Sequence, residues 1–323
     1  MNGSIKLAIA CALMAFGQQL AAQPDAAVVA LNQQDLRLAT IGERMLAANR
    51  DLCRRHMPLT GMVLHTEDQY GSEDTGDAFA NGRVAIAAIV PGSAASAALV
   101  AGDGIAAIGP IRTDTLESDD KVKLRDSAFE LLADQPDGAP VALTIVRGGR
   151  ERPVTLTVPT GCRALVEILA KSALNAKSDG KVIQVNYGIA VDATDEQLAV
   201  VFAHELGHLV LEHRRRLSSE GVKKGLLGEF GRSRRLNREA EIEADQIAVH
   251  LLANAGYDPA IAPAFWRSSL GKRTDAWIFR SFTTLSPEGR AELMEEEIAT
   301  YLTGHTGPSV PSHLLDRRDV PFD

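Results

Sequence analysis

The apolar positions of this chain follow a helical spacing near both ends and a strand-like spacing between them. Leucine and methionine recur every seven residues between Leu31 and Leu52, which predicts one long amphipathic helix over residues 26–56. Between residues 60 and 159, short apolar runs alternate with glycine-rich turns, as in a small β-rich unit. The helical spacing then returns. We therefore predict an α+β chain in which a β-rich unit interrupts a mainly helical domain.

Two later helices are predicted both by their spacing and by their ends. Residues 194–213 begin at Thr194, which with Gln197 forms a capping box, and continue as a strongly apolar helix. A second helix spans residues 239–253 and is stopped by the turn at residues 256–259. Both helices carry side chains that can bind a metal.

The first of these helices contains the sequence His-Glu-Leu-Gly-His at residues 204–208. Residues four apart lie on one face of a helix, so His204 and His208 can present two imidazoles to one metal ion. Glu205 lies about 100° around the helix, beside the position of a metal-bound water. Zinc lowers the pKa of that water to about 7, and the carboxylate can then act as general base. The motif predicts a peptidase zinc centre; the alternative is a buried helix whose histidines only satisfy hydrogen bonds.

A third ligand must come from another segment. Metzincins require glycine at 210 and histidine at 214, where this chain has Val210 and Arg214. His213 lies nine residues after His204, about 180° around the same predicted helix, and should point away from the metal.

The helix over residues 239–253 offers the best third ligand. Glu241 and Asp245 share one of its faces, so Glu241 can reach the metal while Asp245 fixes the tautomer of a ligand histidine. Glu239 and Glu243 are competitors that lie on other faces. The alternative for the whole cluster is an ordinary solvated acidic face.

Together these segments resemble the gluzincin zinc metallopeptidases of the HtpX, BepA and CAAX-prenyl-protease-one type (peptidase family M48). The resemblance rests on the motif at 204–208, the Glu-x-x-Ala-Asp sequence at 241–245 and the Gly-Tyr-Asp-Pro turn at 256–259, and it covers about residues 165–260. Residues 181–185 resemble the edge strand that precedes the active-site helix in that family, and we expect this strand to hold an extended substrate.

The resemblance implies a mainly helical zincin domain with a small edge sheet and one Zn²⁺ ion per chain. It makes His204, His208 and Glu241 the zinc ligands, Glu205 the catalytic base and Asp245 the partner of a ligand histidine.

One further histidine lies in the C-terminal tail. Ser312-His313 resembles the Ser-Thr-His-Pro segment of the family, which can approach the zinc, but the proline after the histidine is missing. Both a site role and a plain surface position are open for His313.

Residues 1–22 have the composition of a cleavable secretory signal. Lys6 precedes an apolar run at residues 7–16, and Ala21 and Ala22 precede a cleavage point. No later apolar run reaches the length of a membrane span. We expect a periplasmic or otherwise exported protein without a mature transmembrane helix.

Cleavage after residue 22 leaves Cys53 and Cys162, an even pair that predicts a disulfide in an exported protein. The two cysteines bracket the β-rich unit. Within that unit, residues 90–94 and 101–108 resemble a bacterial PDZ domain, with a helix at 121–132 and a hairpin at 141–158. PDZ domains bind extended peptides at a sheet edge, and the loop at residues 60–63 would receive a peptide terminus.

These boundaries divide the chain into four parts: a signal peptide at 1–22, an N-terminal helix of the peptidase domain at 23–59, a PDZ-like domain at 60–159 and a zinc metallopeptidase domain at 160–323. A disulfide between the cysteines would clamp the two ends of the insertion together.

The net charge of the chain limits the classes of binding partner that we expect. The net charge of −8 and the pI near 5.6 argue against general binding to nucleic acid, so we expect protein or peptide substrates. A peripheral contact with a membrane or with outer-membrane assembly machinery is a further partner that we consider. Residues 214–238 nevertheless hold nine lysines and arginines. A solvated loop, a gate over the cleft and a contact with anionic lipid are the alternatives for that segment.

We therefore expect an exported zinc endopeptidase of envelope protein quality control whose PDZ-like domain recruits substrates. One alternative is a peptide-binding, chaperone-like envelope protein with an occluded zinc site, against which the intact motif at 204–208 argues. Another is a zinc hydrolase of a different class, against which a peptide-binding domain argues.

Overall fold

The computed structural model describes residues 25–70, 75–118, 123–222, 231–274 and 285–322. Its helices are α1 (Ala26–Ala48), α2 (Leu124–Ala133), α3 (Tyr187–Asp192), α4 (Asp195–Val210), α5 (His213–Ser219), α6 (Gly231–Asn254), α7 (Ile261–Arg267), α8 (Ser269–Thr274), α9 (Pro287–Tyr301) and α10 (Ser312–Leu315). Its strands are β1 (His56–Pro58), β2 (Met62–Thr66), β3 (Val84–Ile89), β4 (Gly104–Ile108), β5 (Ile111–Arg112), β6 (Val141–Arg147), β7 (Arg150–Leu156), β8 (Thr160–Cys162), β9 (Leu165–Leu169), β10 (Ala176–Ser178) and β11 (Val182–Asn186).

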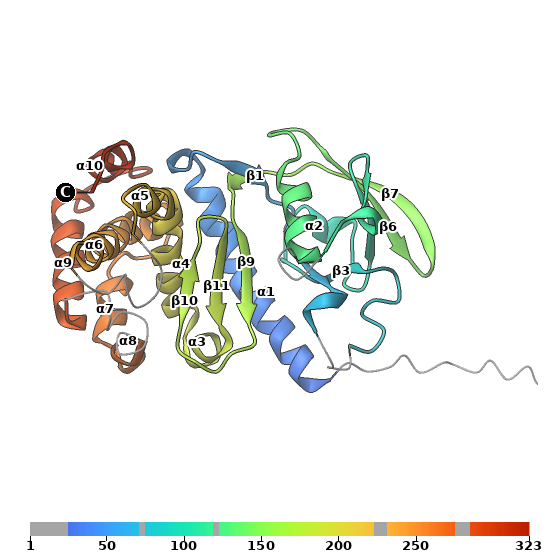
Figure 1. Cartoon of the computed structure of the whole chain (residues 1–323), viewed down its shortest axis with the longest axis horizontal. Coiled ribbons are helices and arrows are strands. Elements are labelled where there is room, and N and C mark those ends of the chain that lie inside the picture. Colours follow the sequence, from blue (N-terminus) through green and yellow to red (C-terminus); the bar gives the residue numbers. More distant parts are fainter. Residues whose placement is uncertain (1–24, 71–74, 119–122, 223–230, 275–284, 323) are drawn as a thin grey trace, which may run out of the picture.

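The mixture of helices and strands is of the predicted α+β kind, with the strands of residues 60–159 at one end and most helices at the other (Figure 1). Helix α1 runs between the two parts. It packs on α4 and β9 on one side and contacts β2 and β3 on the other. The helix ends at Ala48 rather than at the predicted residue 56, because a short 3₁₀ turn at Arg50–Leu52 leads the chain into β1.

The β-rich part contains a six-stranded antiparallel sheet in the order β2-β3-β4-β6-β7, with β5 paired to β4. Gly148 and Gly149 both have positive φ and close the two-residue turn between β6 and β7, a turn that glycine adopts without strain. The sheet and α2 share an apolar core of their own. That core includes Val84, Ile86, Ile105, Ile108, Leu124, Ala128, Leu143 and Ile145.

The helical part has a second, larger core and a three-stranded sheet in the order β10-β11-β9. Strand β11 pairs with β10 antiparallel and with β9 parallel. The expectation that residues 181–185 form an edge strand is wrong, because β11 is the middle strand and both of its edges are paired. The edge beside α4 belongs to β10, which contacts that helix.

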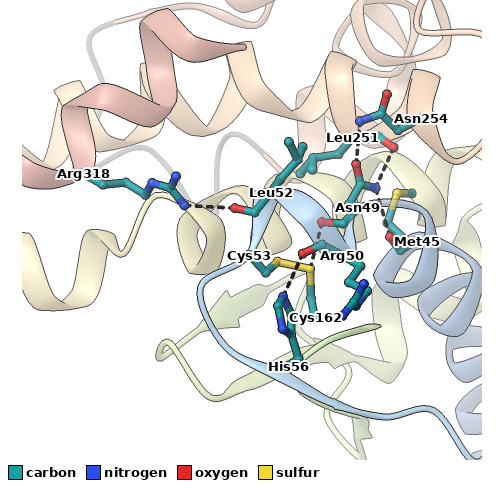
Figure 2. The surroundings of a disulfide bond; sticks show 10 residues. All are labelled: Met45, Asn49, Arg50, Leu52, Cys53, His56, Cys162, Leu251, Asn254 and Arg318. Carbon is teal, nitrogen blue, oxygen red and sulfur yellow. Dashed lines mark hydrogen bonds between the residues drawn. A yellow bond between two sulfur atoms is a disulfide. The ribbon is translucent and has the colours of Figure 1, made fainter. Parts of the chain in front are cut away.

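Two neighbouring connections link the parts, and a disulfide joins them (Figure 2). Strand β1 enters the β-rich part and β8 leaves it, and the two pair antiparallel. Cys53 and Cys162 are bonded just before β1 and at the end of β8, with their Cα atoms 5.5 Å apart. Beside the bond, Asn49 Nδ2 donates to Leu251 O at 3.0 Å, which ties the end of α1 to α6.

The structure describes only part of the predicted basic segment and none of the predicted signal peptide. The basic segment at 214–238 is not a loop in its described parts, since α5 contains its start and α6 begins at Gly231. Residues 223–230 lie outside the described residues, as does the predicted signal at 1–22. Among the helices that the structure describes, none combines the length and apolar character that a membrane crossing needs.

Candidate metal centre

Helix α4 carries the motif of residues 204–208 into the helical core. Thr194 Oγ1 accepts a hydrogen bond from Gln197 N at 3.2 Å, and Gln197 Oε1 accepts one from Thr194 N at 3.0 Å. This reciprocal capping box fixes where the helix begins. Both His204 and Glu205 are buried on it.

Helix α6 crosses α4 closely at Gly207. A β-carbon on Gly207 would lie 2.7 Å from Ile247 Cγ2 and 3.1 Å from Ala244 O, so a larger residue would push the helices apart. The close approach brings Glu241 of α6 opposite the two histidines of α4. The glycine of the motif therefore serves the geometry of the site rather than its chemistry.

Three side chains converge between these helices. His204 Nε2 lies 3.2 Å from His208 Nε2. Glu241 Oε2 lies 3.2 Å from His204 Nε2, and Glu241 Oε1 lies 3.5 Å from His208 Nε2. Bonds of about 2.0–2.1 Å to tetrahedral zinc place ligand atoms roughly 3.4 Å apart, so these separations suit one zinc ion. The three residues that the sequence suggested as ligands are thus brought together.

The donor set also fits a metal ion electrostatically. Glu241 Oε2 is buried, and no donor among the described residues reaches it with hydrogen-bond geometry. A buried carboxylate oxygen without a donor is costly unless a cation meets it. When bound, zinc would supply a Lewis acid that polarises a peptide carbonyl and acidifies a water molecule.

Asp245 holds His204 in the orientation that ligation needs. His204 Nδ1 donates to Asp245 Oδ1 at 3.0 Å, which leaves the lone pair of Nε2 directed at Glu241 and His208. Asp245 also accepts two hydrogen bonds of 2.6 Å from Arg290 of α9. Sequence reasoning missed Arg290, which is fully buried, because a single arginine in a polar helix ordinarily faces water.

His208 is held by a different pair of residues. Its Nδ1 lies 2.8 Å from His213 Nδ1, and His213 Nε2 donates to Glu243 Oε2 at 2.9 Å. The expectation that His213 points away from the centre is wrong. Glu212 adopts a left-handed conformation, with φ of 53°, which ends α4 and turns α5 back toward His208. Arg216 donates to the same Glu243 oxygen at 2.5 Å.

Burial and these partners set the protonation of the centre. Burial alone would lower the pKa of His204, but Asp245 and Glu241 outweigh it and raise that pKa to about 10. The cavity between these carboxylates therefore attracts positive charge, which a metal ion can supply in place of the proton. Burial raises the pKa of Glu205 to about 7, against the pull of His204 toward the ionised form. A carboxyl group with that pKa can exchange protons near neutral pH.

A small hollow of about 20 Å³ opens beside the centre. His204, Glu205, Trp266 and Ala176 of β10 are among its lining residues. Strand β10 lies directly beside the candidate base, because the backbone N–H of Ser178 donates a hydrogen bond to Glu205.

The structure places His313 away from these ligands. It joins His250 of α6 and Glu297 of α9 in a second group of potential metal ligands. His250 lies nine residues beyond Glu241, about 13 Å along the helix. His313 is therefore neither a ligand of the first centre nor a plain surface residue.

Comparison with known proteins agrees with a metallopeptidase. The model of "Peptidase family M48" matches residues 163–232, which include His204, Glu205 and His208 but not Glu241 or Asp245. A metalloendopeptidase from Arabidopsis thaliana is 33% identical over a region that covers 35% of this chain. That protein is named "Mitochondrial metalloendopeptidase OMA1".

The matched region spans 29% of the relative's own length, so much of that protein has no counterpart in the alignment. Both matches show that the region around the motif of residues 204–208 is similar to M48 metallopeptidases.

Proposed function

We propose that this chain is a zinc-dependent endopeptidase that hydrolyses peptide bonds of protein substrates. The observation that carries the proposal is the convergence of His204 Nε2, His208 Nε2 and the Glu241 carboxylate beside the buried Glu205. Two histidines and one carboxylate leave a fourth position on tetrahedral zinc for water or substrate. Glu205 adds the carboxylate that such hydrolysis needs as a base.

The protein's own residues would carry the proton in two steps. The carboxylate of Glu205 removes a proton from the attacking water as its oxygen bonds to the peptide carbonyl carbon. Glu205 then returns that proton to the leaving nitrogen as the peptide bond breaks. Ala176–Ser178 of β10 would hold the substrate extended, because the outer edge of this strand adjoins the hollow that Glu205 lines.

The site of action would be an oxidising compartment outside the cytoplasm. The disulfide between Cys53 and Cys162 supports this, since such bonds persist in exported proteins and are rare in the cytosol. We propose that the peptidase acts in protein quality control in the cell envelope.

The β-rich part would recruit substrates as a PDZ-like domain. Its edge strand β2 lies beside α2, the arrangement in which a peptide adds to a sheet edge and lies against a helix. A cavity of about 360 Å³ is lined by β2 and α2 on one side and by α1 and β9 on the other. Thr60 and Gly61, which directly precede β2, also line this cavity. A peptide bound there would contact both parts of the molecule.

Zinc content and proteolysis test the central claim together. The untagged protein should cleave an unfolded protein such as casein, a chelator should abolish the cleavage, and added zinc should restore it. Cleavage that survives complete removal of metal would overturn the proposal. Binding of unfolded protein without any cleavage, with zinc present, would instead favour a chaperone-like role.

Recruitment is tested by removing the β-rich part. Replacing residues 61–158 by a short glycine–serine linker, with both cysteines kept, should leave hydrolysis of a small peptide within about tenfold while cleavage of whole proteins falls further. An equal loss for both substrates would show that this part does not select substrates.

A further inference from the structure

A second cluster of potential ligands lies between α6, α9 and α10. His250 Nε2 is 2.9 Å from Glu297 Oε1, and His313 Nε2 is 2.7 Å from the same oxygen. All three ligand atoms lie within 4.8 Å of one another. The donor set of two imidazoles and one carboxylate is the same as that of His204, His208 and Glu241, and it suits zinc and similar transition-metal ions.

Hydrogen bonds to atoms other than the potential ligand atoms orient the side chains of this cluster. His250 Nδ1 is paired with Ser309 Oγ at 2.7 Å. Gln246 Nε2 donates to the second oxygen of Glu297 at 2.9 Å. Partners of this kind fix the rings and carboxylates of metal sites, because they leave only the ligand atoms directed inward.

His313 is the part of the cluster that solvent reaches. His250 and Glu297 are buried, whereas 29% of the His313 side chain is exposed. The ring of Tyr301 stacks on His313 at 4.0 Å between centroids and supports it in this half-open position. A metal ion could therefore reach the ligands from solvent.

We propose that His250, Glu297 and His313 form a second metal site, which takes zinc or a similar divalent transition-metal ion. The bound ion would displace the proton that each imidazole shares with Glu297 Oε1. This site shares no ligand with the proposed peptidase centre.

The position of the site suggests a structural role for its metal. An ion there would bond α10 in the C-terminal tail to α6 and α9 at once. Those two helices also supply Glu241 and Arg290 to the first centre. The second metal would thus fasten the tail and hold together the helices that frame the candidate active site.

Zinc titration of the untagged, full-length, metal-stripped protein tests the proposal. We expect two zinc ions per chain by isothermal titration and elemental analysis. His204→Ala should remove one of them, and His313→Gln should remove the other. Glutamine at 313 can still donate to Glu297, so this variant separates metal binding from the hydrogen bond. His305→Ala is the matched control, because His305 is an exposed histidine of the same tail.

The outcomes separate this site from the peptidase centre. A single zinc that is lost in His204→Ala and kept in His313→Gln overturns the second site and leaves the proposed function intact. A single zinc with the opposite behaviour supports the second site and overturns the first. A second zinc whose affinity falls less than about tenfold in His313→Gln is adventitious and overturns the proposal. The number of zinc ions bound by the wild-type protein tests the second site without any variant. A folding defect in a variant therefore cannot leave the proposal untested.

Discussion

His208 and His213 face each other through their Nδ1 atoms at 2.8 Å. His213 Nε2 meets Glu243, which can only accept, so Nε2 of His213 carries the proton and its Nδ1 is an acceptor. His208 must then donate from Nδ1, and the lone pair of its Nε2 is left for a metal. Burial lowers the pKa of His213 against the pull of Glu243, which keeps the ring neutral as this arrangement requires.

Removing His213 should therefore weaken the metal centre without touching a ligand. We expect His213→Ala to raise the zinc concentration needed for half-maximal peptidase activity by about 10–100-fold. Activity in zinc buffers is the measurement, because it reports on the catalytic metal alone. His305→Ala should behave as the wild type. An unchanged zinc dependence in His213→Ala would show that His208 needs no such support.

Glu243→Gln should also raise the zinc concentration needed for half-maximal peptidase activity, but by less than His213→Ala does. Glutamine can still accept from His213 through its carbonyl oxygen, but it leaves the buried Arg216 without its charged partner. A variant at Glu243 is therefore no neutral control for Glu241, although the helical spacing of the two residues had placed Glu243 on another face.

The roles of Glu205 and Glu241 can be told apart by two measurements on each variant. Glu205→Gln keeps the shape of the side chain but cannot accept a proton, so zinc should stay bound while turnover falls by at least about 100-fold. Glu241→Ala should lose both zinc and activity. Glu296→Ala, an exposed carboxylate on α9, should lose neither. Zinc retained by Glu241→Ala would remove Glu241 from the ligand set.

The sequence predicted the parts of this site that depend on one helix at a time. His204 and His208 share a face because they are four residues apart, and the same spacing pairs Glu241 with Asp245. The prediction for His213 failed because it extended α4 through Glu212, whose left-handed backbone ends the helix. Arg290 could not be found, since its burial depends on how α9 packs against α6. The order of the strands also depends on contacts between distant segments. The sequence therefore predicted β11 as a strand but not as the middle strand of its sheet.

The pH dependence of the rate should follow the ionisation of Glu205. Burial raises the pKa of this carboxyl to about 7, and only its deprotonated form can act as base. We expect kcat/KM to fall as the pH decreases from 8 to 5, with the limb at or below pH 7, because a bound cation favours the carboxylate. Zinc content measured at each pH separates this titration from loss of metal. A rate that rises toward acid pH would contradict the assignment.

Asp35 of α1 should make stability fall as the pH rises, the opposite of a carboxylate whose pKa is lowered by folding. It accepts a hydrogen bond from Ile168 N at 2.7 Å, and burial raises its pKa to about 7. The folded state then favours the protonated form, and stability is lost as the pH rises toward 7. Asp35→Asn should therefore be more stabilising at pH 8 than at pH 5, by at least about 1 kcal/mol. Urea unfolding at both pH values measures this, with the exposed Asp51→Asn as control; equal effects at both would refute it.

The bond between Cys53 and Cys162 should contribute strongly to stability and should form only in an oxidising compartment. It closes a loop with a sequence separation of 109, for which chain entropy predicts about 4.8 kcal/mol. The double variant Cys53→Ala/Cys162→Ala should lower the free energy of unfolding by a comparable amount. It should also loosen the junction of β1 and β8, and so speed proteolytic nicking between the two parts. Non-reducing peptide mapping of protein exported by cells should recover the two cysteines in one cross-linked peptide. Recovery of two free thiols instead would remove both the clamp and the main support for export.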